Sequence, residues 1–128
     1  MKNTQLRRGN KVLHNGIEKT IDCISPGYVM LLEDRKRTDD FGQWVNLDEV
    51  EFIPLTEEWL LKFGLEKLDI DLYKIDNEYF ILFFNETYYI ADEDWKNKKR
   101  IIGKGLIYVH QLQNLYFALT GEELTLKP

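Results

Sequence analysis

Cysteine and histidine are scarce in this chain of 128 residues. Cys23 is the only cysteine, so neither a disulfide nor a cluster of thiolate metal ligands can form within one chain. The two histidines, His14 and His110, are scattered along the sequence and show no zinc-site spacing. Asp92-Glu93-Asp94 lacks the glycine and the distal glutamate of a calcium loop, which favours a solvated loop. We therefore expect neither a metal nor a cofactor.

A catalytic set is missing as well. Nucleophilic catalysis needs a serine or cysteine beside a base and an orienting acid, and the chain has no Gly-x-Ser-x-Gly elbow. We interpret Cys23, within an expected strand, as a small packed residue. We interpret His110, in the first turn of the last expected helix, as a helix-start or surface residue. The sequence does not predict an enzyme.

Long hydrophobic runs are absent. The longest, Tyr79–Phe84, is far too short to span a bilayer. Met1–Arg8 carries charge without an apolar run behind it, so we expect no signal peptide and no membrane contact. The hydrophobic fraction of 44% is ample for a folded globular protein. With neither a signal peptide nor a spanning run expected, we expect a soluble, cytoplasmic protein.

The chain also lacks a basic excess. Its net charge is −5, and residues 1–53 carry 8 Lys and Arg against 9 Asp and Glu. Residues 54–128 carry 9 against 13. This balance argues against a general nucleic-acid binder, because such proteins usually have a surplus of cations.

Short strands with tight turns dominate the first half of the chain. Asn15-Gly16 predicts a hairpin because both residues tolerate positive φ. Residues 1–8 are expected to be a frayed or loosely docked start, and residues 33–42 an exposed, charged hairpin tip. The expected strands are 11–14, 17–24, 28–32, 43–46 and 51–53, with a helical turn at 47–50. This pattern indicates a small SH3-like β-barrel over residues 1–53.

A short helix over 56–64 opens the second half and has its own start and stop signals. Thr56 suits the N-cap and Gly64 the left-handed end. Trp59, Leu60 and Phe63 form its apolar face. We expect Trp59 to pack between the two halves, so that they form one compact unit.

An antiparallel β-meander and a second helix complete residues 54–128. The expected strands are 70–75, 79–84 with both faces covered, 87–90 and 101–108, the last interrupted by glycines. The helix runs from Val109 to Thr120 and is stopped by Gly121. Its core residues are Leu112, Leu115, Tyr116 and Leu119, and residues 122–126 add a short edge strand. The whole chain is therefore predicted to be α+β.

Two blocks of the sequence resemble a known family. Pro54–Gly64 and Val109–Leu124 resemble the signature blocks of a family of short uncharacterised proteins from gut Bacteroidales-type bacteria and their phages and prophages. Leu6–Asn10 and Val45–Val50 also resemble that family. The family carries no assigned activity, so the resemblance implies only a phage or mobile-element context.

These observations favour a non-catalytic protein-interaction module, an adaptor or accessory factor. The alternative is a nucleic-acid-binding accessory protein that uses the barrel. Its site would consist of Arg35, Lys36, Arg37 and Trp44, the aromatic side chain stacking on bases. Acidic residues flank this basic cluster and the second one at 96–100, which favours solvated loops and a protein partner. The sequence does not indicate homo-oligomerisation.

Overall fold

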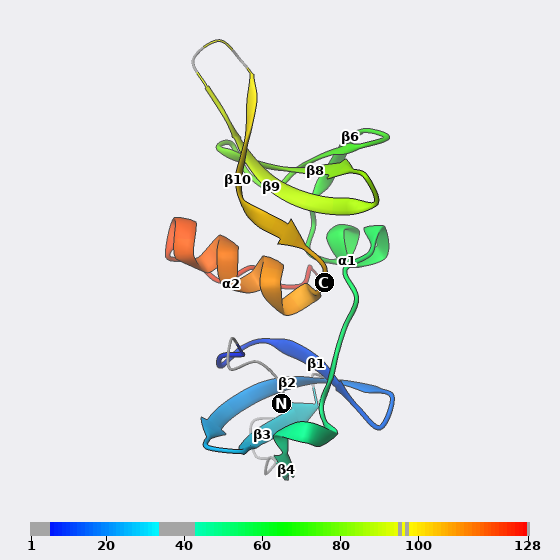
Figure 1. Ribbon diagram of the computed structural model, residues 1–128, viewed down its shortest axis with the longest axis vertical. Coiled ribbons are helices and arrows are strands. Elements are labelled where there is room, and N and C mark those ends of the chain that lie inside the picture. Colours follow the sequence, from blue (N-terminus) through cyan, green and yellow to red (C-terminus); the bar gives the residue numbers. More distant parts are fainter. Residues whose placement is uncertain (1–5, 34–42, 95, 97, 128) are drawn as a thin grey trace. The chain divides into compact units, whose positions relative to one another are not determined.

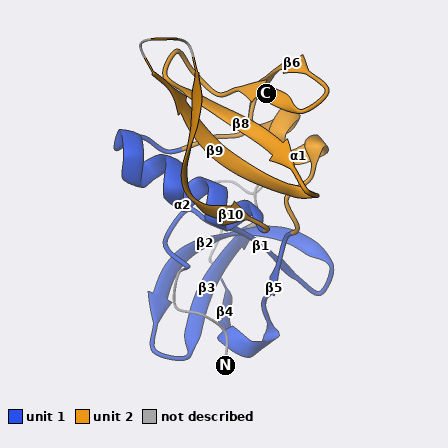
Figure 2. Ribbon diagram, turned by 45° about the horizontal axis from the view of Figure 1, so that its top comes forward, with its two compact units in different colours: residues 1–53, 108–123 blue, residues 54–107, 124–128 orange. Residues whose placement is uncertain are grey.

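The computed structural model describes residues 6–33, 43–94, 96 and 98–127. The chain divides into two compact units, which are coloured separately in Figure 2. Unit 1 contains residues 1–53 and 108–123, and unit 2 contains residues 54–107 and 124–128. The predicted boundary at Ile53 coincides with one unit boundary, but residues 108–123, which the sequence assigned to the second half, group with unit 1. Residues 54–107 of unit 2 are thus inserted between two segments of unit 1, and the chain returns to unit 2 at residue 124.

Unit 1 is built on an antiparallel sheet of five strands, in the order β4-β3-β2-β1-β5 (Figure 1). Its elements are β1 (Lys11–His14), β2 (Ile17–Ser25), β3 (Tyr28–Glu33), β4 (Gln43–Asn46), the 3₁₀ turn η1 (Leu47–Glu49) and β5 (Glu51–Phe52). The order leaves β4 and β5 as the two edges, so the described strands form an open sheet rather than a closed barrel.

The first hairpin follows the turn signal in the sequence. Asn15 and Gly16 have φ of 54° and 76°, and His14 pairs with Ile17 across the turn. A two-residue turn with positive φ at both positions matches the twist of the flanking strands. The prediction of a hairpin at Asn15-Gly16 is therefore confirmed.

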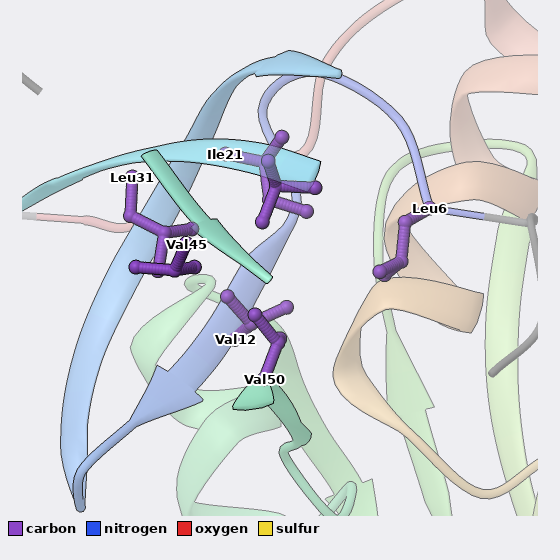
Figure 3. Packing of buried hydrophobic residues seen from close by; sticks show 7 residues of the cluster. Leu6, Val12, Ile21, Leu31, Val45 and Val50 are labelled. Atoms are coloured by element: carbon purple, nitrogen blue, oxygen red, sulfur yellow. The ribbon is translucent and has the colours of Figure 1, made fainter. Parts of the chain in front are cut away.

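One face of this sheet carries the hydrophobic core of unit 1. Figure 3 shows Val12, Ile21, Leu31, Val45 and Val50 converging from β1, β2, β3, β4 and the residue before β5. Leu6 is also buried in this cluster, so the expectation of a frayed or loosely docked start is wrong at Leu6. Residues 1–5 lie outside the described residues, as do residues 34–42 of the expected hairpin tip. An apolar side chain gains free energy by leaving water, which explains why Leu6 is held.

The helix α2 (Val109–Thr120) has the predicted bounds, and Gly121 ends it at φ 75°. Leu112 and Tyr116 are buried, whereas Leu115 and Leu119 are partly buried. The backbone N–H of Val109 donates to the carbonyl of Ile53 at 2.8 Å, so the chain leaves and re-enters unit 1 at neighbouring points. The sequence could not show this pairing because the two residues are separated by the whole of the inserted segment.

Unit 2 has a second antiparallel sheet, in the order β10-β9-β8-β7-β6. Its elements are α1 (Glu57–Lys62), β6 (Glu66–Asp69), β7 (Leu72–Lys74), β8 (Tyr79–Phe84), β9 (Thr87–Glu93) and β10 (Lys99–Leu106). The single strand expected over 70–75 is wrong: residues 70–71 form the turn between β6 and β7. The expectation that both faces of β8 are covered also fails at its end, where Phe84 is exposed.

The short helix α1 confirms the start and stop signals. The hydroxyl of Thr56 accepts from the N–H of Trp59 at 3.5 Å, and Gly64 has φ 85°. The side chains of Trp59, Leu60 and Phe63 are all buried. Neither of the helices that the structure describes has the length and apolar character of a membrane span.

The C-terminal segment differs from the expected edge strand. Residues 122–127 form no strand. Instead, the N–H of Lys127 donates to the carbonyl of Lys62 at 2.8 Å, at the end of α1. Leu124 is buried and adds an apolar contact to this backbone bond. A helix end has unpaired carbonyls that can accept such a bond, and this offers an alternative to sheet pairing.

Candidate interaction surface

An aromatic surface lies on the face of the unit 1 sheet opposite the core. Cys23 of β2 pairs with Met30 of β3, which pairs with Trp44 of β4, so these three side chains form a row on one face. Tyr28 lies on the same face, two residues from Met30 along β3. Trp44 and Tyr28 are each 50% exposed. We name these four residues the aromatic face.

A β-bulge gives Cys23 its place on this face. Ile21 pairs with Leu31, but Cys23 pairs with Met30, so Asp22 is an extra residue in β2. The cysteine is exposed, and the interpretation of Cys23 as a packed core residue is wrong. The sequence alternation cannot show this, because a bulge changes which face each later residue occupies.

A small apolar pocket lies at the same end of the sheet, on the core side. Ile24 and Val29 are cross-strand partners that point toward the core face. The pocket has a volume of about 250 Å³ and is lined by Leu6, Ile24, Ser25, Pro26, Gly27, Val29 and Leu47. The N–H of Leu47 donates to the carbonyl of Gly27 at 2.9 Å, which ties η1 to the β2–β3 turn. The pocket is therefore held open by backbone structure.

Acidic residues follow the pocket along the chain. Residues 43–53 contain Asp48, Glu49 and Glu51 and no lysine or arginine, and all three acidic residues are exposed. Residues 20–32 likewise contain no lysine or arginine. Arg7 and Arg8 follow the lining residue Leu6, but both are engaged by carboxylates: Arg7 pairs with Glu123, and Arg8 lies 3.6 Å from Asp22. The exposed acidic residues after Leu47 therefore favour a cation near the pocket.

The residues expected to contact nucleic acid are divided between described and undescribed parts of the chain. Arg35, Lys36 and Arg37 lie outside the described residues, whereas Trp44 lies exposed on β4. In the second basic cluster, Lys99 and Arg100 are engaged in ion pairs. Lys99 lies 2.8 Å from Glu93, and Arg100 lies 3.0 Å from Asp92, as cross-strand pairs of β9 and β10. The solvated loop expected over 92–100 is correspondingly shorter.

Both histidines are buried. His110 lies in the first turn of α2 as expected, but it is not a surface residue. His110 is 2% exposed, and its ring lies 4.5 Å from that of Phe52 and 5.8 Å from that of Tyr108. Burial lowers the pKa of His110 to about 4, because the charged form loses its hydration. Its Nδ1 has no hydrogen-bond partner among the described residues. His14 lies 3.7 Å from Glu49.

In unit 2, Glu57 of α1 links two strands through its carboxylate. Its carboxylate accepts from the Tyr73 hydroxyl at 3.1 Å and lies 2.6 Å from the ammonium of Lys67. Hydrogen bonds from Lys67 and Tyr73 lower the pKa of Glu57. Burial, and then the hydrogen bond to Glu57, raise the pKa of Tyr73 to about 12. These contacts attach α1 to β6 and β7.

No described residues form a cluster suited to a metal ion, counting groups of three or more His, Cys, Asp or Glu. In the acidic stretch 92–94, Asp92 and Glu93 pair with basic residues of β10. The carboxylate of Asp94 accepts the backbone N–H groups of Lys96 and Lys98, each at 2.9 Å. These acids therefore stabilise the β9–β10 hairpin.

Comparisons with protein-family models, with curated proteins and with solved structures gave no match to this chain.

Proposed function

We propose that the protein is a non-catalytic interaction module of phage or mobile-element origin, which binds a protein partner through unit 1. The observation that carries this proposal is the aromatic face, where Trp44 and Tyr28 each leave half of their surface in water. Aromatic side chains are enriched at the centres of protein interfaces, because they bury a large apolar area with few rotatable bonds. The apolar pocket at the same end of the sheet adds a second point of attachment.

The finer fold assignment of unit 1 as an SH3-like barrel belongs to this proposal. It is supported by five short antiparallel strands in the order β4-β3-β2-β1-β5 and by the 3₁₀ turn directly before the last strand. Fold alone does not assign a function. The exposed side chains of the aromatic face support the proposal.

Site-directed photo-cross-linking tests the proposal. In one variant of the full chain, the photo-cross-linker p-benzoylphenylalanine replaces Trp44. In a matched control it replaces Ile70 of unit 2, which is 79% exposed. The probe at 44 should give a saturable protein adduct in host or phage lysate that excess unlabelled chain competes away. Tyr28→Ala should weaken that adduct, while the probe at 70 gives none. Equal labelling at both positions, or no saturable protein adduct, would refute the proposal.

Nucleic-acid binding is the second candidate. The exposed indole of Trp44 favours it, since an aromatic ring on a sheet face can stack on a base. The acidic residues of 43–53 oppose it, because phosphate binding needs cations without competing acids. The affinity for nucleic acid should fall steeply as the salt concentration rises. Binding should be lost when Arg35, Lys36 and Arg37 are together changed to alanine.

A further inference from the structure

We propose that the apolar pocket of unit 1 accepts one large apolar side chain from a basic segment of the protein partner. This inference rests on the proposed function and specifies the chemistry of the partner. It concerns the pocket at the β2–β3 turn, on the sheet face opposite the aromatic face.

The size of the pocket favours a single side chain. Its volume of about 250 Å³ lies below the roughly 300–1,000 Å³ of pockets that enclose drug-sized ligands. Ser25 is the only lining residue with a polar side chain, so the interior offers little hydrogen bonding to a polar ligand. A leucine or phenylalanine side chain gains about 1.5–3 kcal/mol from complete burial.

The pocket needs little rearrangement to bind. Val29 is fully buried in the core, and the Leu47–Gly27 hydrogen bond fixes the opposite wall. Gly27 has φ 80°, and a Cβ placed there would meet nothing within 4 Å, so the turn leaves open space beside it. A preformed site loses less conformational entropy on binding than a flexible one.

Charge decides which segment can approach. Leu47 lines the pocket, and Asp48 and Glu49 follow it at the surface. Lysine or arginine residues flanking the inserted side chain would meet these carboxylates, whereas an acidic segment would be repelled. A nucleic acid or a second copy of this chain, with its net charge of −5, would bring like charge to the acidic border.

Amide-shift titrations of the full chain with model peptides test this pocket. The probes are Lys-Lys-Phe-Lys-Lys, Glu-Glu-Phe-Glu-Glu and Lys-Lys-Ala-Lys-Lys, all with blocked ends. The first peptide should shift the amide signals of Gly27, Val29 and Leu47 saturably. It should bind about tenfold or more tightly than the other two, which lack either the cations or the apolar side chain. Added salt should weaken its binding.

Ile24→Lys provides the decisive variant, because residue 24 lines the pocket. Since 47% of its surface is exposed, the change is compatible with folding. The added cation should lower the affinity for Lys-Lys-Phe-Lys-Lys by about tenfold. Ile17→Lys introduces the same charge at a residue with 51% exposure in the first hairpin and should leave the affinity unchanged. Asp48→Asn should lower the affinity for the basic peptide and raise the affinity for the acidic one.

The outcomes separate this inference from the proposed function. Equal binding of the acidic and basic peptides, or shifts centred on the aromatic face, would overturn the pocket assignment. Concentration-dependent self-association lost in Ile24→Lys would identify a second copy as the occupant and would overturn it as well. A third outcome is that no peptide binds, while the protein adduct at position 44 is unchanged in Ile24→Lys. This outcome would support the proposed interaction module and overturn only the assignment of the pocket.

Discussion

The side-chain amide of Gln113 on α2 donates from Nε2 to the carbonyl of Gly9 at 3.0 Å, across a separation of 104 positions. Its Oε1 accepts the backbone N–H of Lys11 at 2.9 Å, so one side chain satisfies both groups at the start of β1. Beside it, Asn10 donates to Asn114 at 2.7 Å, and Arg7 pairs with Glu123. These contacts join the two stretches 6–10 and 109–124, and they explain why α2 belongs to unit 1.

Gln113→Leu should destabilise unit 1 by about 1–3 kcal/mol, because it removes the side-chain partners of the Gly9 carbonyl and the Lys11 N–H, which are partly buried. Urea unfolding followed by circular dichroism measures this loss. Gln43→Leu, the same substitution at an exposed position of β4, should change the free energy of unfolding by less than about 0.5 kcal/mol. A loss at Gln113 no greater than this control would show that the two hydrogen bonds do not hold α2.

Trp59→Ala should lower the free energy of unfolding by about 3–5 kcal/mol, because it removes a large buried side chain from α1. The chain passes between the units at 53/54, 107/108 and 123/124, so each unit is completed only after the chain has passed through a segment of the other. We therefore expect a single unfolding transition that the substitution shifts as a whole. Two separate transitions in calorimetry would contradict the expectation from the sequence that the halves are coupled.

His110 should make the protein less stable in mild acid. Its pKa is about 4 in the folded protein and about 6.5 in an unfolded chain. Between these values the unfolded state binds more protons, so stability falls as the pH is lowered. The difference amounts to about 2 kcal/mol between pH 7 and pH 5. Urea unfolding at both pH values measures it, and His110→Phe should reduce the pH dependence by that amount. An unchanged dependence in this variant would show that His110 is not the group responsible.

Tyr73 should titrate late when the pH is raised. Its folded pKa is about 12, against about 10 when unfolded. The folded state therefore keeps this proton longer, and its stabilising effect is lost as the pH rises from 10 toward 12. The ultraviolet absorbance is measured against pH for the unchanged chain and for Tyr73→Phe. The difference between the two curves gives the titration of this tyrosine. The same substitution should cost about 1 kcal/mol at neutral pH through the lost hydrogen bond to Glu57. A midpoint near 10 would contradict the burial and bonding of this hydroxyl.

Local signals in the sequence predicted the features that depend on neighbouring residues. Thr56, Gly64 and Gly121 mark the helix ends, and Asn15-Gly16 marks a hairpin, because each requires only a cap or a positive φ at that position. These features are correct in the structure.

Features that depend on distant residues were not predictable. The burial of His110 follows from ring packing against Phe52, far away in the sequence. The exposure of Cys23 follows from a bulge that alternation does not reveal. The missing C-terminal strand follows from the bond between Lys127 and Lys62. In the candidate surface, the sequence singled out Trp44 but not its neighbours Met30 and Tyr28, which only the strand register brings together.

The central claim, that unit 1 binds protein rather than nucleic acid, is tested most directly by fluorescence anisotropy. The full chain is titrated into short single- and double-stranded DNA and RNA at low and at high salt. We expect no saturable binding, even at low salt, because residues 43–53, which include Trp44, carry three exposed acidic residues and no lysine or arginine. Salt-sensitive binding that disappears in Trp44→Ala, or when Arg35, Lys36 and Arg37 are together changed to alanine, would contradict the account and establish the nucleic-acid alternative.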